Sequence, residues 1–113
     1  MLAKKFRLPL QGAPAGGFRT IRGDFFVLKK RKSDLPLSRL AVLAGKKIDK
    51  RSARRNKIKR TIVNFCEKKK INLAPGFDFL IIGQPKLSFL TEEEIRQELK
   101  KIFSDDPDLK KYV

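Results

Sequence analysis

Apolar and polar residues alternate over short segments in the first half of the chain, which is the pattern of half-buried strands. Residues 18–22 alternate in this way, and residues 25–30 follow a turn signal at Gly23-Asp24. Residues 39–44 are almost wholly apolar and predict a third strand, which we place at the centre of the sheet. Because the connections are short, we expect these three strands to form an antiparallel meander.

The apolar spacing changes to the 3.6-residue period of a helix after residue 49. Either Asp49 or Ser52 could cap this helix, because both side chains can accept a hydrogen bond from a free backbone N–H. Residues 74–76, Ala-Pro-Gly, stop the helical region. The predicted buried stripe consists of Ile58, Ile62, Phe65 and Cys66.

A fourth strand and a second helix complete the pattern. Residues 77–82 read FDFLII and predict the strand. Thr91 and Glu94 have the spacing of a capping box and predict the start of the helix. Its apolar stripe consists of Ile95, Leu99 and Ile102, with Phe103 beside it.

The order of three strands, a helix, a strand and a helix predicts an α+β fold. We expect a single-domain sandwich over residues 18–104, in which helices pack on a mixed, mostly antiparallel four-stranded sheet. Residues 1–17 are broken by Pro and Gly, so they predict an irregular N-terminal arm with a helix that is short or absent. Residues 105–113 are expected to form a frayed C-terminal tail.

The net charge and its distribution along the chain indicate the class of binding partner. The chain has a net charge of +16 over 113 residues, and residues 46–70 alone hold twelve Lys or Arg beside two acidic residues. Seven of the twelve acidic residues lie in residues 92–113. Such a concentration of cations repels itself, so it indicates a polyanionic partner, and nucleic acid is the obvious candidate.

The rare residue types exclude several classes of protein. The chain has no His, so the usual general base is absent, and its single Cys, Cys66, forms no intrachain disulfide or thiolate cluster. Its apolar runs are far shorter than the ~20 residues of a membrane span. These features indicate a soluble, cytoplasmic protein without a membrane partner.

The start of the basic helix is the candidate binding site. Arg54 and Arg55 fall in its first turn, where the helix dipole disfavours cations by about 0.3–1 kcal/mol each. Free N–H groups and guanidinium groups converge there on an anion, which makes a phosphate site. Asn56 could orient a neighbouring Arg, contact a hydrated cation indirectly, or contact sugar or base; a local cap or a solvated residue is the alternative.

The motifs around this helix resemble those of the bacterial ribonuclease P protein subunit. They are Lys46-Lys47-Ile48, the segment Arg55-Asn56-Lys57-Ile58-Lys59-Arg60, and the strand that begins Gly76-Phe77-Asp78. The similarity spans roughly residues 18 to 103. It implies the same order of elements and, in addition, a left-handed βαβ crossover, which general rules disfavour.

The resemblance also implies a function. In that family the protein assists a catalytic RNA, which uses bound Mg²⁺ to remove the 5′ leader from precursor tRNA. The implied partners are the ribonuclease P RNA and precursor tRNA with its leader, and no catalytic residue or direct metal ligand is expected in the protein. The expected RNA-binding residues are Lys46, Lys47, Arg51, Arg54, Arg55, Asn56, Lys57, Lys59 and Arg60.

Two departures from the family pattern affect the site. Lys57 stands where the family usually has Arg, which keeps the charge and loses the bidentate fork. The family also opens with a helix whose aromatic residues line a cleft for the leader, and here Pro9 interrupts that segment. Phe26 and Leu28 alternate onto one face of the second strand and are candidates for lining the cleft; ordinary core positions are the alternative.

Three other functions fit parts of the sequence. A ribosomal or other structural RNA-binding protein has the same composition, and only the motifs argue against it. A DNA-binding regulator would need a helix-turn-helix pair or a dimer seam, whereas the basic helix is followed by a strand. A free-standing nuclease would need clustered carboxylates, and most of the acidic residues lie outside the basic region.

Overall fold

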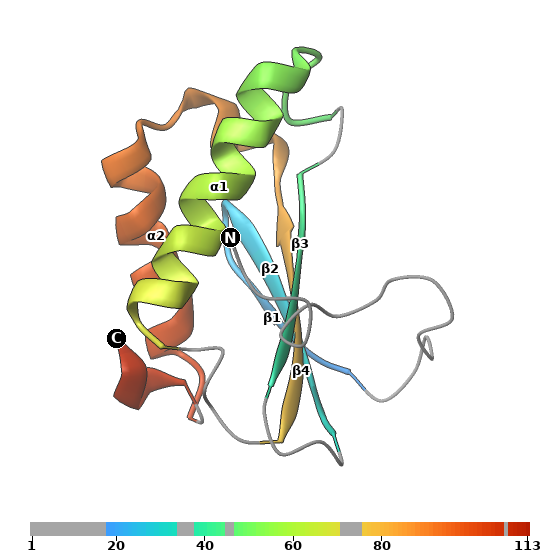
Figure 1. The fold of residues 1–113 in the computed structure, drawn as a ribbon, viewed down its shortest axis with the longest axis vertical. Coiled ribbons are helices and arrows are strands. Elements are labelled where there is room, and N and C mark those ends of the chain that lie inside the picture. Colours follow the sequence, from blue (N-terminus) through green and yellow to red (C-terminus); the bar gives the residue numbers. More distant parts are fainter. Residues whose placement is uncertain (1–17, 34–37, 45–46, 71–75, 108) are drawn as a thin grey trace.

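The computed structural model describes residues 18–33, 38–44, 47–70, 76–107 and 109–113. The predicted irregular arm at residues 1–17 lies outside these ranges. Within them, the order of elements agrees with the sequence prediction, with two short 3-10 helices (η3 and η4) in addition (Figure 1). The elements are β1 (Arg19–Arg22), β2 (Phe26–Lys32), β3 (Arg39–Leu43), α1 (Ser52–Lys68), β4 (Phe77–Gly83), η3 (Pro85–Phe89), α2 (Glu92–Ser104) and η4 (Lys110–Tyr112).

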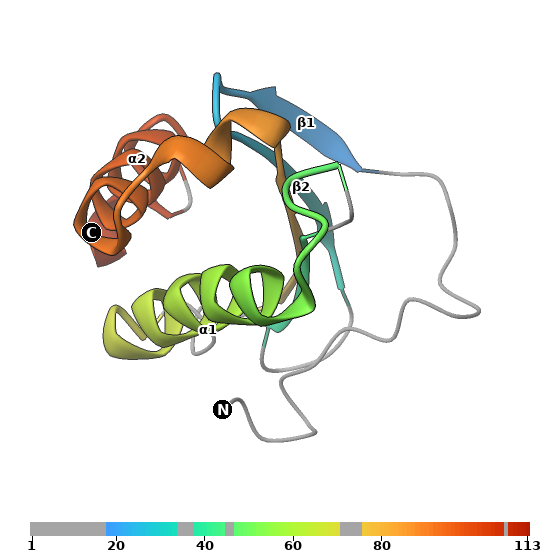
Figure 2. The same ribbon diagram turned by 90° about the horizontal axis from the view of Figure 1, so that it is seen from above.

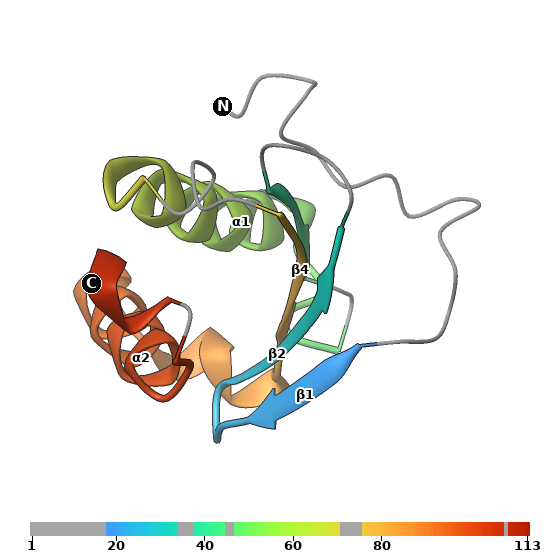
Figure 3. The same cartoon turned by 90° about the horizontal axis from the view of Figure 1, so that it is seen from below.

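Both α-helices cover the same face of the sheet, as Figures 2 and 3 show from opposite ends. The predicted stripes of the two helices are buried between them and the strands, and Phe65 of α1 stacks on Phe103 of α2 with ring centroids 5.9 Å apart. The capping box of Thr91 and Glu94 is also present at the start of α2. The α+β sandwich is therefore confirmed.

The sheet has the strand order β1-β2-β4-β3, so the predicted meander is wrong. Strands β1 and β2 form an antiparallel hairpin, but β3 pairs only with β4, in parallel, and lies at the edge of the described sheet. The central position goes to β4, which lies between β2 and β3. The apolar sequence of β3 did not reveal its position in the sheet. Leu40 and Val42 face the helices from an edge strand, and they would face them in the same way from a central strand.

The connection from β3 through α1 to β4 is left-handed. Viewed from the helix side of the sheet with both strands pointing upward, β4 lies to the left of β3 (Figures 1 and 2). Almost all such crossovers are right-handed. The handedness therefore agrees with the resemblance and opposes the general rule.

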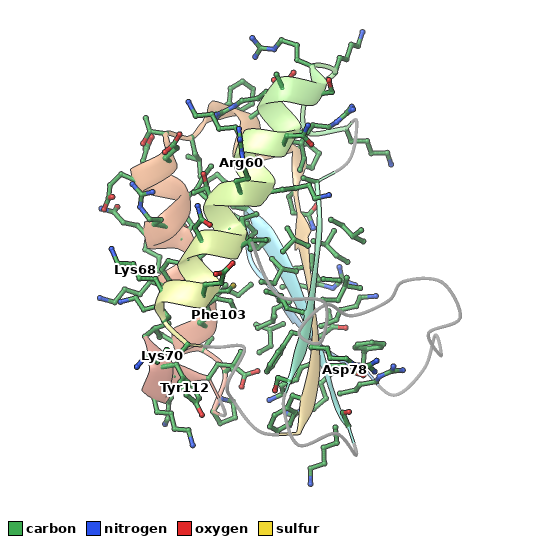
Figure 4. All side chains as sticks on the ribbon, in the orientation of Figure 1. Arg60, Lys68, Lys70, Asp78, Phe103 and Tyr112 are labelled. Atoms are coloured by element: carbon green, nitrogen blue, oxygen red, sulfur yellow. The ribbon has the colours of Figure 1, made fainter. Side chains whose placement is uncertain are left out.

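Asp78 links the central strand to both of its neighbours. Its side chain is 2% exposed and accepts two hydrogen bonds from Arg39 of β3, each 3.0 Å long, and one of 3.2 Å from Arg31 of β2. Asp78 lies on the side of the sheet away from α1 (Figure 4). Arg31 and Arg39 are its direct cross-strand partners and therefore share that side. Before Asp78, Gly76 has a φ of +75°, which a side chain would strain. The Gly-Phe-Asp motif thus has a structural role in the sheet.

The predicted frayed tail at residues 105–113 is wrong for the residues that the structure describes. Asp106 is fully buried, and its carboxylate lies 2.9 Å from the ammonium of Lys30 in β2. Leu109 is also fully buried and belongs to the hydrophobic core. The segment is mostly polar, so its sequence did not indicate that Asp106 and Leu109 are buried.

We predict that Asp78→Ala lowers the free energy of unfolding by about 3 kcal/mol, because it leaves two Arg side chains without their shared carboxylate. Urea denaturation measures this difference. Glu93→Ala is the matched control, since its ion pair with Arg96 is exposed and its loss should change stability by less than about 1 kcal/mol. Equal effects of the two substitutions would contradict the structural role of Asp78.

Candidate nucleic-acid interface

Helix α1 begins without a side-chain cap. Arg51 is its N-cap residue and makes no capping hydrogen bond, so the prediction that Asp49 or Ser52 caps the helix is wrong. The Asp49 carboxylate instead accepts hydrogen bonds from the backbone N–H of Arg51, at 2.8 Å, and from its guanidinium, at 3.1 and 2.9 Å. These bonds lower the pKa of Asp49 to about 2. The first turn of α1 therefore keeps its free N–H groups and contains no acidic residue.

Arg54 and Arg55 are half-buried and bind neighbouring backbone. The Arg54 guanidinium donates to the carbonyl oxygen of Leu90, just before α2, at 2.7 Å. Arg55 donates to the carbonyl oxygen of Asp49 at 3.4 Å, which is a long and weak bond. Arg54 thus joins α1 to the start of α2, a role that the sequence pattern did not reveal.

Lys57 is also partly neutralised. Its ammonium lies 3.2 Å from the carboxylate of Glu92 in the first turn of α2, and both side chains are substantially exposed. A pair of this kind contributes little to stability and can exchange for another anion. Lys57 is therefore available to a partner at the loss of one surface ion pair.

Asn56, Lys59 and Arg60 form the open part of the site. All three are exposed on the side of α1 away from the sheet, and none has an ion pair or side-chain hydrogen bond with a described residue. Figure 4 shows Arg60 midway along α1. A phosphate group that approaches this surface meets two unneutralised cations and an amide that can both donate and accept.

The remaining predicted cations lie before the helix. Lys47 is exposed, and Arg51 is exposed and paired with Asp49. Lys46 lies outside the described residues. The structure therefore divides the predicted set into free, paired and structural cations, although the sequence presents them as one run.

The proposed leader-cleft residues Phe26 and Leu28 belong to the core. Each is 1% exposed and faces the helices, so neither presents surface to a bound RNA strand. The prediction that they line a leader cleft is therefore wrong. Alternation along a strand identifies two faces and does not say which face the helices cover.

Phe89 is a candidate that the sequence did not indicate. It is 85% exposed in η3, one residue before the carbonyl that Arg54 binds. Exposed aromatic rings beside cations are typical of proteins that stack on unpaired RNA bases. A Phe between Ser88 and Leu90 gave no periodic signal of exposure.

The donor groups of the site do not suit a directly bound Mg²⁺. Mg²⁺ prefers carboxylate and phosphate oxygens, and α1 offers it only the Asn56 amide on its open surface. Across the described ranges, no three His, Cys, Asp or Glu side chains gather in a way that could hold a metal ion. In the same ranges, every helix is too short or too polar to cross a bilayer.

Comparisons of sequence agree with this picture. The sequence model of the Ribonuclease P family matches residues 17–105. The ribonuclease P protein component of Thermotoga maritima is 34% identical over 70 residues, which are 62% of this chain and 59% of that relative. The component from Stutzerimonas stutzeri is 34% identical over 83 residues, 74% of this chain and 63% of that relative. The matched segment thus spans less than two thirds of these relatives.

Solved structures show the same fold. The RNase P protein from Thermotoga maritima, in complex with 1-(4-fluorophenyl)-2-thiourea, superposes with a TM-score of 0.66 at 28% identity, over 74% of this chain and 81% of that chain. The RNase P protein of Staphylococcus aureus reaches a TM-score of 0.75 at 20% identity, over 81% of this chain and 84% of that chain. The second likeness concerns the fold alone.

We predict that Arg51→Gln raises the pKa of Asp49 from about 2 partway toward 3.8, because the guanidinium bond is lost while the backbone N–H still donates. The folded-state pKa is the depressed one, so the stabilisation from this pair is present above about pH 4 and disappears as the pH falls toward 2. Carboxyl NMR titration measures the shift. Arg96→Gln, in α2, should leave the Asp49 titration unchanged; an unchanged titration in Arg51→Gln would contradict the assignment.

Proposed function

The chain belongs to the ribonuclease P protein family, and we propose that it is the RNA-binding subunit of a ribonuclease P. In this role it assists the catalytic RNA of a cytoplasmic holoenzyme in the endonucleolytic removal of the 5′ leader from precursor tRNA. Its partners are the ribonuclease P RNA and the precursor tRNA.

One observation carries this proposal: the open surface of α1 lies at the family's RNA-contacting motif. Asn56, Lys59 and Arg60 are exposed and unneutralised by any described residue there, in a chain of net charge +16. The free N–H groups of the first turn of α1 precede this surface along the same helix. Docking RNA phosphates on this surface relieves the mutual repulsion of the cations and releases counterions from the RNA.

We assign the hydrolysis to the RNA subunit. The chain has no His, and most of its described carboxylates lie on α2 or pair with cations, as Asp49, Asp78 and Asp106 do. Mg²⁺ bound to the RNA supplies the activation of water. The protein's residues bind and orient the RNA by charge and hydrogen bonding, which favours Mg²⁺ binding to the RNA.

The 5′ leader is proposed to lie on the face of the sheet opposite the helices. Lys29 faces that side, because its neighbour Leu28 faces the helices, and its cross-strand partner is Leu80. Ile82 of β4 lies on the same face, and all three side chains are partly exposed. This combination of a cation and apolar side chains suits a single strand that is bound through phosphates and bases.

The ribosomal alternative rests on composition alone. The family match and the fold both weigh against it, since they select one family among small basic RNA-binding proteins. The two functions differ in a single assay, the processing of precursor tRNA by ribonuclease P RNA.

We expect that the protein alone leaves precursor tRNA uncut, whereas adding it to a bacterial ribonuclease P RNA lowers the Mg²⁺ concentration needed for leader removal. Gel analysis of the cleavage products over a Mg²⁺ titration measures both effects. The RNA without protein is the control. If no bacterial-type RNA is stimulated, the ribosomal alternative takes precedence.

We expect Arg60→Ala to affect RNA binding and Arg54→Ala to affect stability. Arg60→Ala should weaken binding to the catalytic RNA about 5-fold at 0.1 M salt, with thermal stability unchanged or slightly raised, since one phosphate contact is lost and repulsion falls. Arg54→Ala should lower the free energy of unfolding by about 1 kcal/mol, because its hydrogen bond to Leu90 is lost. Filter binding and thermal denaturation separate the two. A large loss of stability in Arg60→Ala would show that the residue is structural.

A further inference from the structure

A groove of about 810 Å³ lies between the C-terminal half of α1 and α2. Its walls are formed by α1 residues between Thr61 and Lys69 and by α2 residues between Glu92 and Lys100. The two helices run side by side over one face of the sheet (Figures 1 and 2). The groove is as large as the sites that bind small ligands in other proteins, which range from about 300 to 1,000 Å³.

The charges in the groove are separated along its length. Its acidic side chains, Glu92 and Glu93, are at the start of α2 and pair with Lys57 and Arg96. Lys68 and Lys100 also line the groove, and neither has an ion pair with a described residue. The free charge in the groove is therefore positive.

Uncharged polar groups lie between these charges. Asn64 of α1 and Gln97 of α2 both line the groove and are exposed. Phe65 lies among them, with the ammonium of Lys69 5.9 Å from the centre of its ring. Amides that donate and accept beside free ammonium groups can bind sugar hydroxyls and phosphates together.

The position of Lys100 argues against a purely structural explanation. Lys68 is in the last turn of α1, where a cation stabilises the helix dipole whether or not a ligand binds. Lys100 lies within α2, four residues before its end, and its neighbour Lys101 is paired with Glu98 on another side of the helix. Helix stability alone does not account for an unpaired Lys on the groove side.

We propose that this groove binds the sugar–phosphate backbone of the catalytic RNA, with Lys68 and Lys100 as the phosphate contacts. The groove continues the open surface of α1 that is proposed to contact RNA. Arg60, Asn64 and Lys68 follow one another at intervals of four residues along one flank of α1, about 6 Å apart along the helix axis. Figure 4 shows Lys68 near the lower end of α1, below Arg60. The identity of the RNA rests on the proposed function, and Asn64 and Gln97 would contact its sugars or base edges.

The first test compares neighbouring lysines of α2. Lys100→Gln should weaken binding of the protein to ribonuclease P RNA about 5-fold at 0.1 M salt, and Lys68→Gln/Lys100→Gln about 25-fold. The slope of log affinity against log salt should fall by about 0.7–0.9 for each Lys. Lys101→Gln is the matched control and should change affinity less than 2-fold. All substituted side chains are exposed, so unchanged melting temperatures establish that the fold is intact.

The outcomes separate the two proposals. If the unsubstituted protein does not bind ribonuclease P RNA, the proposed function fails and the identity of this RNA fails with it. If Arg60→Ala weakens binding while Lys68→Gln/Lys100→Gln and Lys101→Gln both bind as the unsubstituted protein does, the groove proposal alone is overturned. A loss confined to the affinity of the holoenzyme for precursor tRNA would overturn the choice of the catalytic RNA as occupant.

A second test locates the groove on the RNA directly. Cys66 is the only Cys of the chain, it is fully buried, and burial raises the pKa of its thiol, so it reacts poorly with labels. Gln97→Cys therefore carries the single accessible thiol and can be labelled with an iron chelate that cleaves nearby RNA. We expect cuts at one site in the catalytic RNA within the complex. Cuts found only in precursor tRNA, or no cuts in a complex that still processes its substrate, would contradict the proposal.

Discussion

The shared carboxylate of Asp78 is the interaction on which the sheet depends. It is almost fully buried and joins guanidinium groups from β2 and β3 to the central strand between them. Without it, Arg31 of β2 and Arg39 of β3 would lose the carboxylate that joins them to β4 on this face of the sheet. The parallel pairing of β3 with β4 fixes where the connecting helix begins and ends, so the position of α1 follows from this arrangement.

The few carboxylates of this chain decide which cations remain free. Asp78 and Asp106 are buried and neutralise cations of β2 and β3, while Glu92 and Glu93 pair with exposed cations along the groove. Lys59 and Arg60 have no described acidic neighbour on the open surface of α1. A protein with net charge +16 thus keeps its fold by local pairing and leaves its repulsion concentrated where a polyanion can relieve it.

The periodicity of apolar residues predicted the helices and strands well, but it predicted poorly which of them lie side by side. The stripes of α1 and α2 and the capping box at Thr91 depend on local spacing, so the sequence was sufficient to find them. The insertion of β4 between β2 and β3, the burial of Leu109 and the bond from Arg54 to Leu90 join residues far apart in the chain. For the site, the sequence located the basic helix. It could not separate Arg60, which is open, from Arg54, which is structural, because both are the same residue type in one cationic run.

The contacts that join α1 to α2 make the groove between these helices preorganised. The Arg54–Leu90 bond holds the first turn of α1 against the start of α2, and the stacked rings of Phe65 and Phe103 hold the helices together further along. The width between the helices is therefore set when the protein folds, before any partner arrives. A rigid receptor loses little conformational entropy on binding, so more of the attraction between opposite charges appears as affinity. The same rigidity favours partners of one shape, which gives a highly charged protein a means of selection that charge alone does not provide.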